Sequence, residues 1–292
     1  MTLGRLFSLA FLLLAASGVA MAETPAAPKY GSNAAAGGYV EHGGVRFYYE
    51  TYGSGPPLLL IHGNGANIRS LSGQIDYFRK SRRVIVMDSR DHGRSGDSPV
   101  PLTFEMLSDD LAHLLDDLRT GPVDVLGWSD GGIEALLLGL RHPEKVTRIA
   151  AMAANLDPAG VYPAFLDPPE APLPPGKVLD PKAARERRVK ALDRDEPHIK
   201  PEALEAIVAP TLVMASDHDA IRDEHTLEIY HHLRNSQLVI FPNATHMIPI
   251  DDPATFNAAA DRFFSTPFVK KDRLGDLLKT LQRLMAEAAA EK

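Results

Sequence analysis

A serine lies at the centre of the stretch whose residue types best suit chemistry. Ser129 stands in the hexapeptide Gly127-Trp128-Ser129-Asp130-Gly131-Gly132, between an apolar run over 123–126 and a helical pattern from Ile133. A nucleophile on a sharp strand-to-helix turn needs these glycines, because side chains there would collide with neighbouring backbone. The helix N-terminus also points N–H groups at the reacting centre. The pattern therefore predicts a nucleophile for acyl transfer, with a plain turn as the alternative.

Three further polar stretches directly follow apolar runs. His62-Gly63-Asn64-Gly65 follows the run 58–61, Asp217-His218-Asp219 follows 211–214, and His246 comes shortly after 238–241. In a serine hydrolase, a histidine takes the serine proton and an acid orients that histidine. The glycine-rich turn predicts that the backbone N–H of Asn64 points into a cavity as half of an oxyanion hole; an ordinary glycine-rich loop is the alternative.

Strand and helix patterns alternate along the chain, which predicts an α/β fold with a mostly parallel sheet and helices on both faces. The strands are expected at 39–42, 45–52, 58–61, 83–87, 123–126, 146–152, 211–214 and 238–241, and the helices at 70–80, 104–118, 133–141, 181–192, 223–233 and 253–264. In such a sheet, polar chemistry collects at the carboxyl ends of the strands. All four polar stretches above follow such ends.

One long segment breaks the alternation. Residues from about 155 to 208 are rich in proline and contain a basic helix, which predicts an inserted lid over the site within a domain spanning 38–292. The basic residues of that helix fit a solvated face better than an anion site. The tail, 272–285, has leucines on one stripe and is expected to dock on the body of the domain.

The N-terminus has the three parts of an export signal. Arg5 is followed by the apolar run 6–16 and by the small-residue pattern Ala20-Met21-Ala22. We expect a signal peptide over 1–22, cleaved after Ala22, then a flexible tether over 23–37, and a periplasmic or secreted protein. An uncleaved anchor is the alternative, although the apolar run is short for a bilayer, which takes about 20 residues.

Composition narrows the classes of partner and cofactor. The 292 residues carry a net charge of −7 and contain no cysteine, which argues against nucleic acid or an anionic membrane as partner and excludes disulfides. A metal site from His225, His231 and His232 is conceivable, but adjacent histidines project from different sides of a helix. We therefore expect no metal site. The oligomeric state is left open.

The combined motifs resemble the α/β-hydrolase superfamily over nearly all of the expected mature chain. Besides the nucleophile turn and the His62 turn, they are the loop 88–95, the strand from Pro210 that leads to Asp219, and Ala244-Thr245-His246. Two positions depart from the usual pattern, since Asp91 and Ser216 stand where the family usually has glycine. The family spacing places the triad acid at Asp219 and leaves Asp217 to serve the loop, a choice that the alternation of elements alone does not make.

The resemblance implies an ester hydrolase with a triad of Ser129, Asp219 and His246 and an oxyanion hole from the N–H groups of Asn64 and Asp130. It also implies a small-molecule ester substrate and neither a metal nor an organic cofactor. The hexapeptide resembles the valacyclovir-hydrolase-like (biphenyl hydrolase-like) branch, whose members hydrolyse amino-acid esters. That branch implies a substrate pocket with Trp128 and with Asp130, whose carboxylate would bind an ammonium group. A helix-capping role is the alternative for Asp130.

Other members of the superfamily leave alternatives open. Haloalkane dehalogenases and epoxide hydrolases place an aspartate where Ser129 stands and are disfavoured. Cofactor-free perhydrolases (haloperoxidases) share the triad, and lactone or amide hydrolases use the same chemistry. A non-catalytic binding protein on the same fold is the alternative of another class. It is disfavoured because such members often lose a triad residue.

Overall fold

The computed structural model describes residues 29–270 and 273–290. The predicted signal peptide over 1–22, its cleavage site and the start of the predicted tether lie outside the described residues. Within the described part of the chain, no helix has the length and apolar character needed to cross a membrane.

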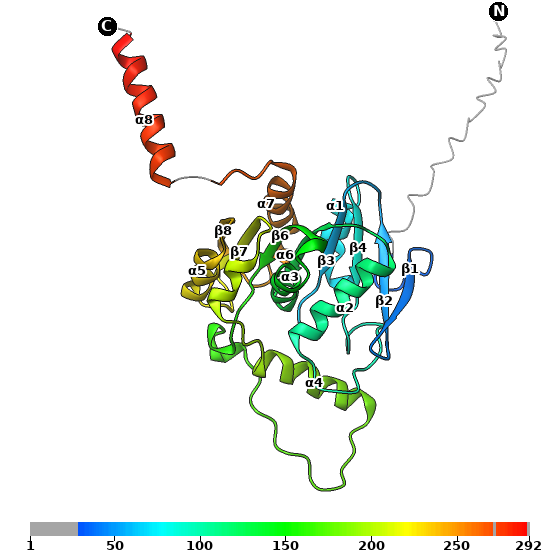
Figure 1. Ribbon diagram of the computed structural model, residues 1–292. Coiled ribbons are helices and arrows are strands. Elements are labelled where there is room, and N and C mark those ends of the chain that lie inside the picture. The colour runs from blue at the N-terminus through cyan, green and yellow to red at the C-terminus, as the bar shows by residue number, and fades with distance from the viewer. Residues whose placement is uncertain (1–28, 271–272, 291–292) are drawn as a thin grey trace, which may run out of the picture.

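Eight strands form one sheet in the order β1-β2-β4-β3-β5-β6-β7-β8 (Figure 1). They are β1 (Gly37–His42), β2 (Val45–Tyr52), β3 (Pro57–Ile61), β4 (Arg83–Met87), β5 (Val123–Trp128), β6 (Val146–Met152), β7 (Thr211–His218) and β8 (Ser236–Thr245). β2 pairs antiparallel with β1 and β4, and the other neighbouring strands pair in parallel. The prediction of a mostly parallel α/β sheet is confirmed.

Helices cover both faces of this sheet. They are α1 (Ser72–Phe78), α2 (Phe104–Asp117), α3 (Asp130–Arg141), α5 (Asp223–His232), α6 (Ile248–Asp251) and α7 (Pro253–Ser265). Leu59 and Ile61 of β3 enter a core with α2, α3 and α5, whereas Leu58 and Leu60 enter a second core with α1, α6 and α7. Successive strand side chains alternate between faces. A strand covered on both faces is therefore apolar throughout, as these runs are.

Part of the segment predicted as a tether packs against the sheet. The buried carboxylate of Glu50 in β2 accepts hydrogen bonds from the backbone N–H groups of Gly31 (2.9 Å) and Asn33 (2.8 Å). It also accepts from the hydroxyls of Tyr48 (2.7 Å) and Tyr52 (2.8 Å). Four donors compensate the burial of this charge. The ordered body of the protein therefore begins before β1.

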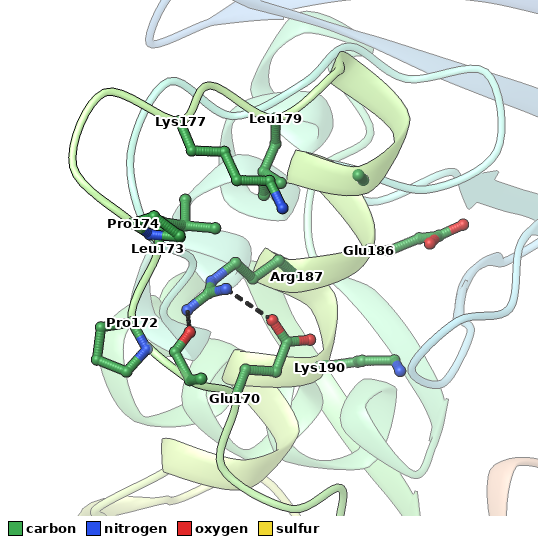
Figure 2. A pocket seen from close by; sticks show the side chains of 11 residues that line it. Glu170, Pro172, Leu173, Pro174, Lys177, Leu179, Glu186, Arg187 and Lys190 are labelled. Carbon is green, nitrogen blue, oxygen red and sulfur yellow. Dashed lines mark hydrogen bonds and ion pairs between the residues drawn. The ribbon is translucent and has the colours of Figure 1, made fainter.

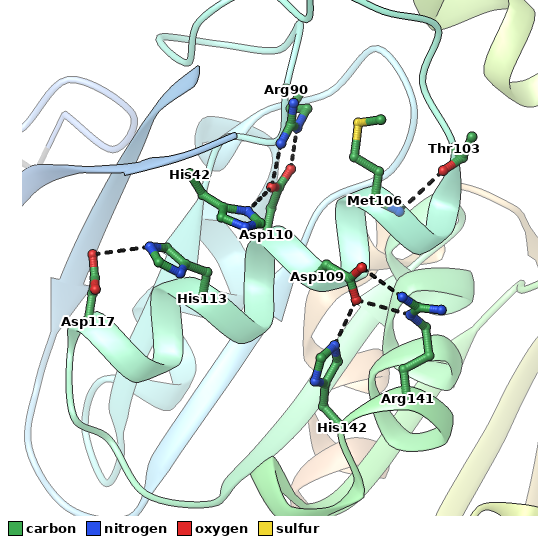
Figure 3. Close-up of polar contacts among 10 residues, drawn as sticks. All are labelled: His42, Arg90, Thr103, Met106, Asp109, Asp110, His113, Asp117, Arg141 and His142. Atoms are coloured by element: carbon green, nitrogen blue, oxygen red, sulfur yellow. Dashed lines mark hydrogen bonds and ion pairs between the residues drawn. The ribbon is translucent and has the colours of Figure 1, made fainter. Parts of the chain in front are cut away.

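Two adjacent aspartates fasten α2 to its neighbours (Figure 3). The buried Asp110 accepts hydrogen bonds from Arg90 Nε (2.5 Å) and Nη2 (2.7 Å), and its Oδ1 lies 2.8 Å from His42 Nδ1. Asp109 binds Arg141 at the end of α3 in the same bidentate way, at 3.0 and 2.7 Å. The loop after β4, the first hairpin and α3 are therefore tied to one helix.

The long segment between β6 and β7 contains the residues predicted to form a lid. Its main element is α4 (Pro181–Asp195), joined to β6 by a long loop that reaches away from the body (Figure 1). Leu192 of α4 is buried in the first core. A polar cavity of about 490 Å³ lies between the loop and the outer side of α4, where Arg187 binds Glu170 at 2.9 Å and the carbonyl of Ala171 at 3.1 Å (Figure 2).

The prediction that the C-terminal tail docks on the body is wrong. Helix α8 (Arg273–Ala290) stands away from the sheet in Figure 1. Its stripe of leucines, predicted to be buried, is 46–65% exposed at positions 274, 277, 278, 281 and 284. The period predicted the helix correctly, but an apolar stripe does not specify which surface covers it.

Candidate active site

Ser129 occupies a strained turn between β5 and α3. Its backbone angles are φ 58° and ψ −122°, in a region that residues other than glycine rarely adopt. A Cβ on Gly127 would lie 1.8 Å from the carbonyl oxygen of Gly131, and one on Gly131 would lie 2.3 Å from that of Ile61. Both glycines are therefore required by close backbone approach, and the turn lifts the Ser129 hydroxyl above the sheet.

The structure brings Ser129, His246 and Asp219 into one hydrogen-bonded line. His246 Nε2 lies 3.0 Å from Ser129 Oγ, and His246 Nδ1 lies 2.7 Å from Asp219 Oδ1. With its proton on Nδ1, the ring donates to Asp219 and accepts from the serine hydroxyl. The Asp219 side chain is fully buried, whereas that of His246 is 21% exposed. The base is therefore accessible from solvent while its acid partner is not.

Backbone donors hold Asp219 in place. Its Oδ2 accepts from the N–H of Ser216 at 3.0 Å, and its Oδ1 accepts from that of Ile221 at 3.3 Å. The hydroxyl of Ser216 donates to the carbonyl of Thr245 at 2.7 Å, directly before His246. Ser216, one of the two departures from the family pattern, thus links the loop of the acid to the loop of the base. No local pattern of residues predicts this contact.

Asp217 has a different environment. Its carboxylate accepts hydrogen bonds from the N–H groups of Asn243 (2.8 Å) and Ala244 (3.0 Å) and lies 2.9 Å from His218 Nδ1. The two backbone donors, followed by His218, lower the pKa of Asp217 to about 2. Asp217 therefore braces the end of β8 and makes no contact with His246.

Trp128 holds the backbone of His246 in place. Its indole N–H donates to the carbonyl of His246 at 2.9 Å, and the two rings are 5.9 Å apart. Trp128 is buried in the second core, with 6% of its surface exposed. The structure thus gives this residue, predicted to line a substrate pocket, a contact that positions the loop of His246.

The turn after β3 brings a second set of N–H groups to Ser129. A Cβ on Gly63 would lie 3.0 Å from Ser129 Cβ, so glycine permits the close approach of this turn. Within the described residues, the N–H groups of Asn64 and Asp130 donate to no other residue. Asn64 therefore offers an available donor at one of the two positions predicted for the oxyanion hole, whereas the N–H of Asp130 also bonds its own carboxylate.

Two buried histidines hold this turn to the loop after β4. His62 Nε2 accepts from the N–H of Ser89 at 3.1 Å, and His92 Nε2 accepts from that of Gly65 at 3.1 Å. Burial is the largest cause that lowers the pKa of each histidine to about 4. Both rings are therefore neutral near pH 7 and able to accept these hydrogen bonds.

Acidic groups gather beside the nucleophile. The buried Asp130 accepts from Asn64 Nδ2 at 2.9 Å. Burial and then the negative charge of Asp193, on α4, raise the pKa of Asp130 to about 7. Burial also raises the pKa of Asp193 and that of Glu134, which lies one turn along α3. Asp193 was not predicted as a site residue, because a residue of the long segment between β6 and β7 has no fixed spacing from the motifs of the site.

Known proteins resemble this chain in sequence and in fold. The model of the alpha/beta hydrolase fold family matches residues 56–176. A pimeloyl-[acyl-carrier protein] methyl ester esterase of Neisseria meningitidis is 31% identical over 230 residues, which cover 65% of this chain and 86% of that protein. The chain belongs to the α/β-hydrolase family.

This α/β hydrolase is also similar to the sn-1-specific diacylglycerol lipase ABHD11 of Mus musculus, with 27% identity over 253 residues, 72% of this chain and 81% of the relative. Among solved structures, the enol-lactonase of Burkholderia xenovorans LB400 superposes with a TM-score of 0.65 at 18% identity, covering 78% of this chain and all of the lactonase. The likeness to the lactonase shows the fold alone. The relatives support a hydrolase that acts on a small molecule.

Proposed function

We propose that this hydrolase cleaves carboxylic esters through an acyl-enzyme on Ser129. The observation that carries the proposal is the line from Ser129 Oγ through His246 to the buried Asp219, at 3.0 and 2.7 Å, on a strained strand-to-helix turn. Strain of this kind persists where the surrounding structure enforces it and clusters at active sites. The ester-cleaving relatives agree with the assignment.

The proposed reaction has two halves. Ser129 Oγ attacks the ester carbonyl carbon while His246 Nε2 takes the hydroxyl proton. The bond to the leaving oxygen then breaks, and His246 returns the proton to the departing alcohol. Water, deprotonated by His246, attacks the acyl-enzyme in turn and releases the acid and Ser129. Asp219 holds the ring and stabilises its positive charge, and the N–H groups of Asn64 and Asp130 bind the oxyanion. Such a donor contributes about 2.7–4 kcal/mol to lowering the barrier.

Two substitutions test this assignment. Ser129→Ala and His246→Ala should each abolish most ester hydrolysis while the protein stays folded by circular dichroism. Because both residues act in one unit, the double variant should be scarcely slower than either single one. A fluorophosphonate should label the wild type at Ser129, as located by peptide mass spectrometry. Near-normal turnover by folded Ser129→Ala protein would refute the proposal.

A substrate panel separates the remaining activities. Lactones and amides would form the same acyl-enzyme, and a perhydrolase would pass the acyl group to hydrogen peroxide in place of water. Short and long acyl esters, aminoacyl esters, lactones and amides, each with and without peroxide, should show the highest kcat/KM for an ester. Absence of turnover with every substrate would favour a binding protein.

Asp130 supports an amino ester as a finer candidate for the substrate. Its carboxylate lies beside the nucleophile, and Asp193 adds a second negative charge. Its side chain accepts hydrogen bonds from Asn64 Nδ2 and from its own backbone N–H at the start of α3. A charge-assisted hydrogen bond to an ammonium group contributes roughly 1.5–3 kcal/mol, or about 10- to 150-fold in kcat/KM. An aminoacyl ester should outpace its des-amino analogue in wild type but not in Asp130→Asn. Equal kcat/KM in wild type would refute this candidate.

We also propose that the protein works in the periplasm or after secretion. The support is the basic, apolar and Ala-x-Ala succession of residues 5–22. Expression of the full chain followed by cell fractionation should place the protein outside the cytoplasm, with Glu23 as its first residue. A cytoplasmic protein that retains residue 1 would contradict this location.

A further inference from the structure

The second departure from the family pattern, Asp91, lies in the loop after β4. Its φ of 60° falls in the left-handed region, which favours the glycine usual at this position. An aspartate there is strained, yet its side chain is fully buried. Its Oδ1 accepts from the N–H of Ser98 at 3.0 Å. This carboxylate forms an ion pair with an arginine of α4.

That residue is Arg188 of α4. Its Nε donates to Asp91 Oδ2 and its Nη2 to Asp91 Oδ1, each at 2.7 Å. A bidentate pair of this kind fixes orientation as well as distance. Arg185, three residues earlier on the same side of the helix, donates through Nε to Asp97 of the same loop at 2.7 Å. Two arginines therefore seat α4 on the loop after β4, with the Asp91 contact the more buried.

The residue after Arg188 contacts the proposed oxyanion hole. Asn64 Nδ2 donates to the carbonyl of Val189 at 3.2 Å and to Asp130 Oδ2 at 2.9 Å. Asn64 lies between Gly63 and Gly65, and Gly65 has a φ of 64°. Glycines on both sides leave the backbone at Asn64 free to adopt several conformations unless other contacts restrict it. His92 holds the N–H of Gly65, and the side chain of Asn64 supplies a further restriction at Asn64 itself, with one of its two acceptors on α4.

We infer that Asp91 and Arg188 are positioning residues for the oxyanion hole. Their ion pair seats α4 so that the Val189 carbonyl and the Asp130 carboxylate together fix Asn64, and with it the N–H that meets the oxyanion. The inference rests on the proposed function, in which that N–H stabilises the transition state. It makes the lid part of the catalytic apparatus in addition to its role as a cover.

The test compares Arg188→Gln with Arg187→Gln. Arg187, the preceding residue, binds Glu170 on the outer side of α4 and serves as the matched control. Arg188→Gln should lower kcat for an ester about 10- to 100-fold, because a displaced donor loses part of what a deleted donor loses. KM should change less than about threefold. Inhibition by a phenylboronic acid, whose tetrahedral adduct places an oxygen in the hole, should weaken by the same factor as kcat. Arg187→Gln should match wild type.

Two further variants test whether Asp91, Arg188 and Asn64 act through the same chain of contacts. Asp91→Gly, which suits the left-handed backbone, should match Arg188→Gln, and the pair together should be no worse than either alone. Asn64→Ala keeps the backbone N–H but loses the two side-chain bonds. It should show the same loss, and adding Arg188→Gln should cause no further loss. If Arg188→Gln fails to fold, Arg188→Lys, which keeps one contact, should give an intermediate kcat.

Two outcomes would overturn the inference. One is a higher KM in Arg188→Gln with unchanged kcat and unchanged affinity for the boronic acid. That result would mean that α4 contacts the substrate but does not position the oxyanion hole. The other is additive loss in the Asn64→Ala background. Failure of the proposed function looks different, because wild type would then show no fluorophosphonate label at Ser129 or no loss in Ser129→Ala.

Discussion

Asp217 and Asp219 lie two residues apart but are held by different partners. Asp219 is buried against His246, whereas Asp217 binds the backbone at the end of β8. We expect Asp219→Asn to lower kcat about 10³- to 10⁴-fold, because an amide partner favours the wrong tautomer of the histidine. Asp217→Asn should lower it less than tenfold. Steady-state kinetics on both purified variants give the ranking, and the reverse order would assign the acid to Asp217.

Residue types and spacing indicate the residues that we propose to react, but not the contacts that hold them. Ser129 and His246 follow strand ends, and the family spacing singled out Asp219 between two candidate acids. The contacts of Ser216, Asp91 and Arg188 join segments far apart in the chain. Each depends on a partner whose position is fixed only by the folded structure, so no local pattern could predict them.

At the scale of elements, the turn after β3 and the loop after β4 depend on neutral histidines. His62 and His92 have a pKa of about 4 in the folded protein, against 6.5 in an exposed histidine. The unfolded chain therefore binds more protons between these values, and the stabilisation is complete above about pH 6.5 and lost as the pH falls through 4. We expect a loss of roughly 1–3 kcal/mol per histidine. Urea unfolding at pH 7, 5.5 and 4.5 measures it.

His92→Gln provides the control for that measurement. Glutamine can accept a hydrogen bond but does not titrate, so the dependence on pH should be shallower in the variant. An equally steep slope in wild type and variant would show that other groups cause the acid sensitivity.

Element boundaries were predicted best where burial and pairing end together. β4 and β6 run from Arg83 to Met87 and from Val146 to Met152, as predicted. β7 and β8 extend past their apolar runs to His218 and Thr245, because the two strands continue to pair beyond the core. Apolar patterns report burial, so they miss backbone pairing that continues into exposed polar residues.

Over the whole molecule, the sequence predicted the layered sheet but not where outlying helices lie. The alternation of strands and helices leaves few ways to bury both faces of a parallel sheet. The need to bury the faces of the sheet does not determine where α4 and α8 lie. Helix α4 is oriented by a few specific contacts, such as those of Arg185 and Arg188. The leucines of α8 form an apolar stripe that fits equally well against this body or against another surface.

The seating of α4 also bears on the physical state of the substrate. Moving this helix aside would break the ion pairs of Arg185 with Asp97 and of Arg188 with Asp91 and bring the buried Leu192 into water. We expect that a helix held by these contacts does not move merely because the protein meets an oil–water interface. The rate should therefore rise smoothly with dissolved ester and show no interfacial activation when a longer-chain ester is assayed across its critical micelle concentration. An abrupt increase at that concentration would mean that α4 moves as a hinged flap. Without one, this hydrolase is suited to single molecules in solution rather than to lipid aggregates.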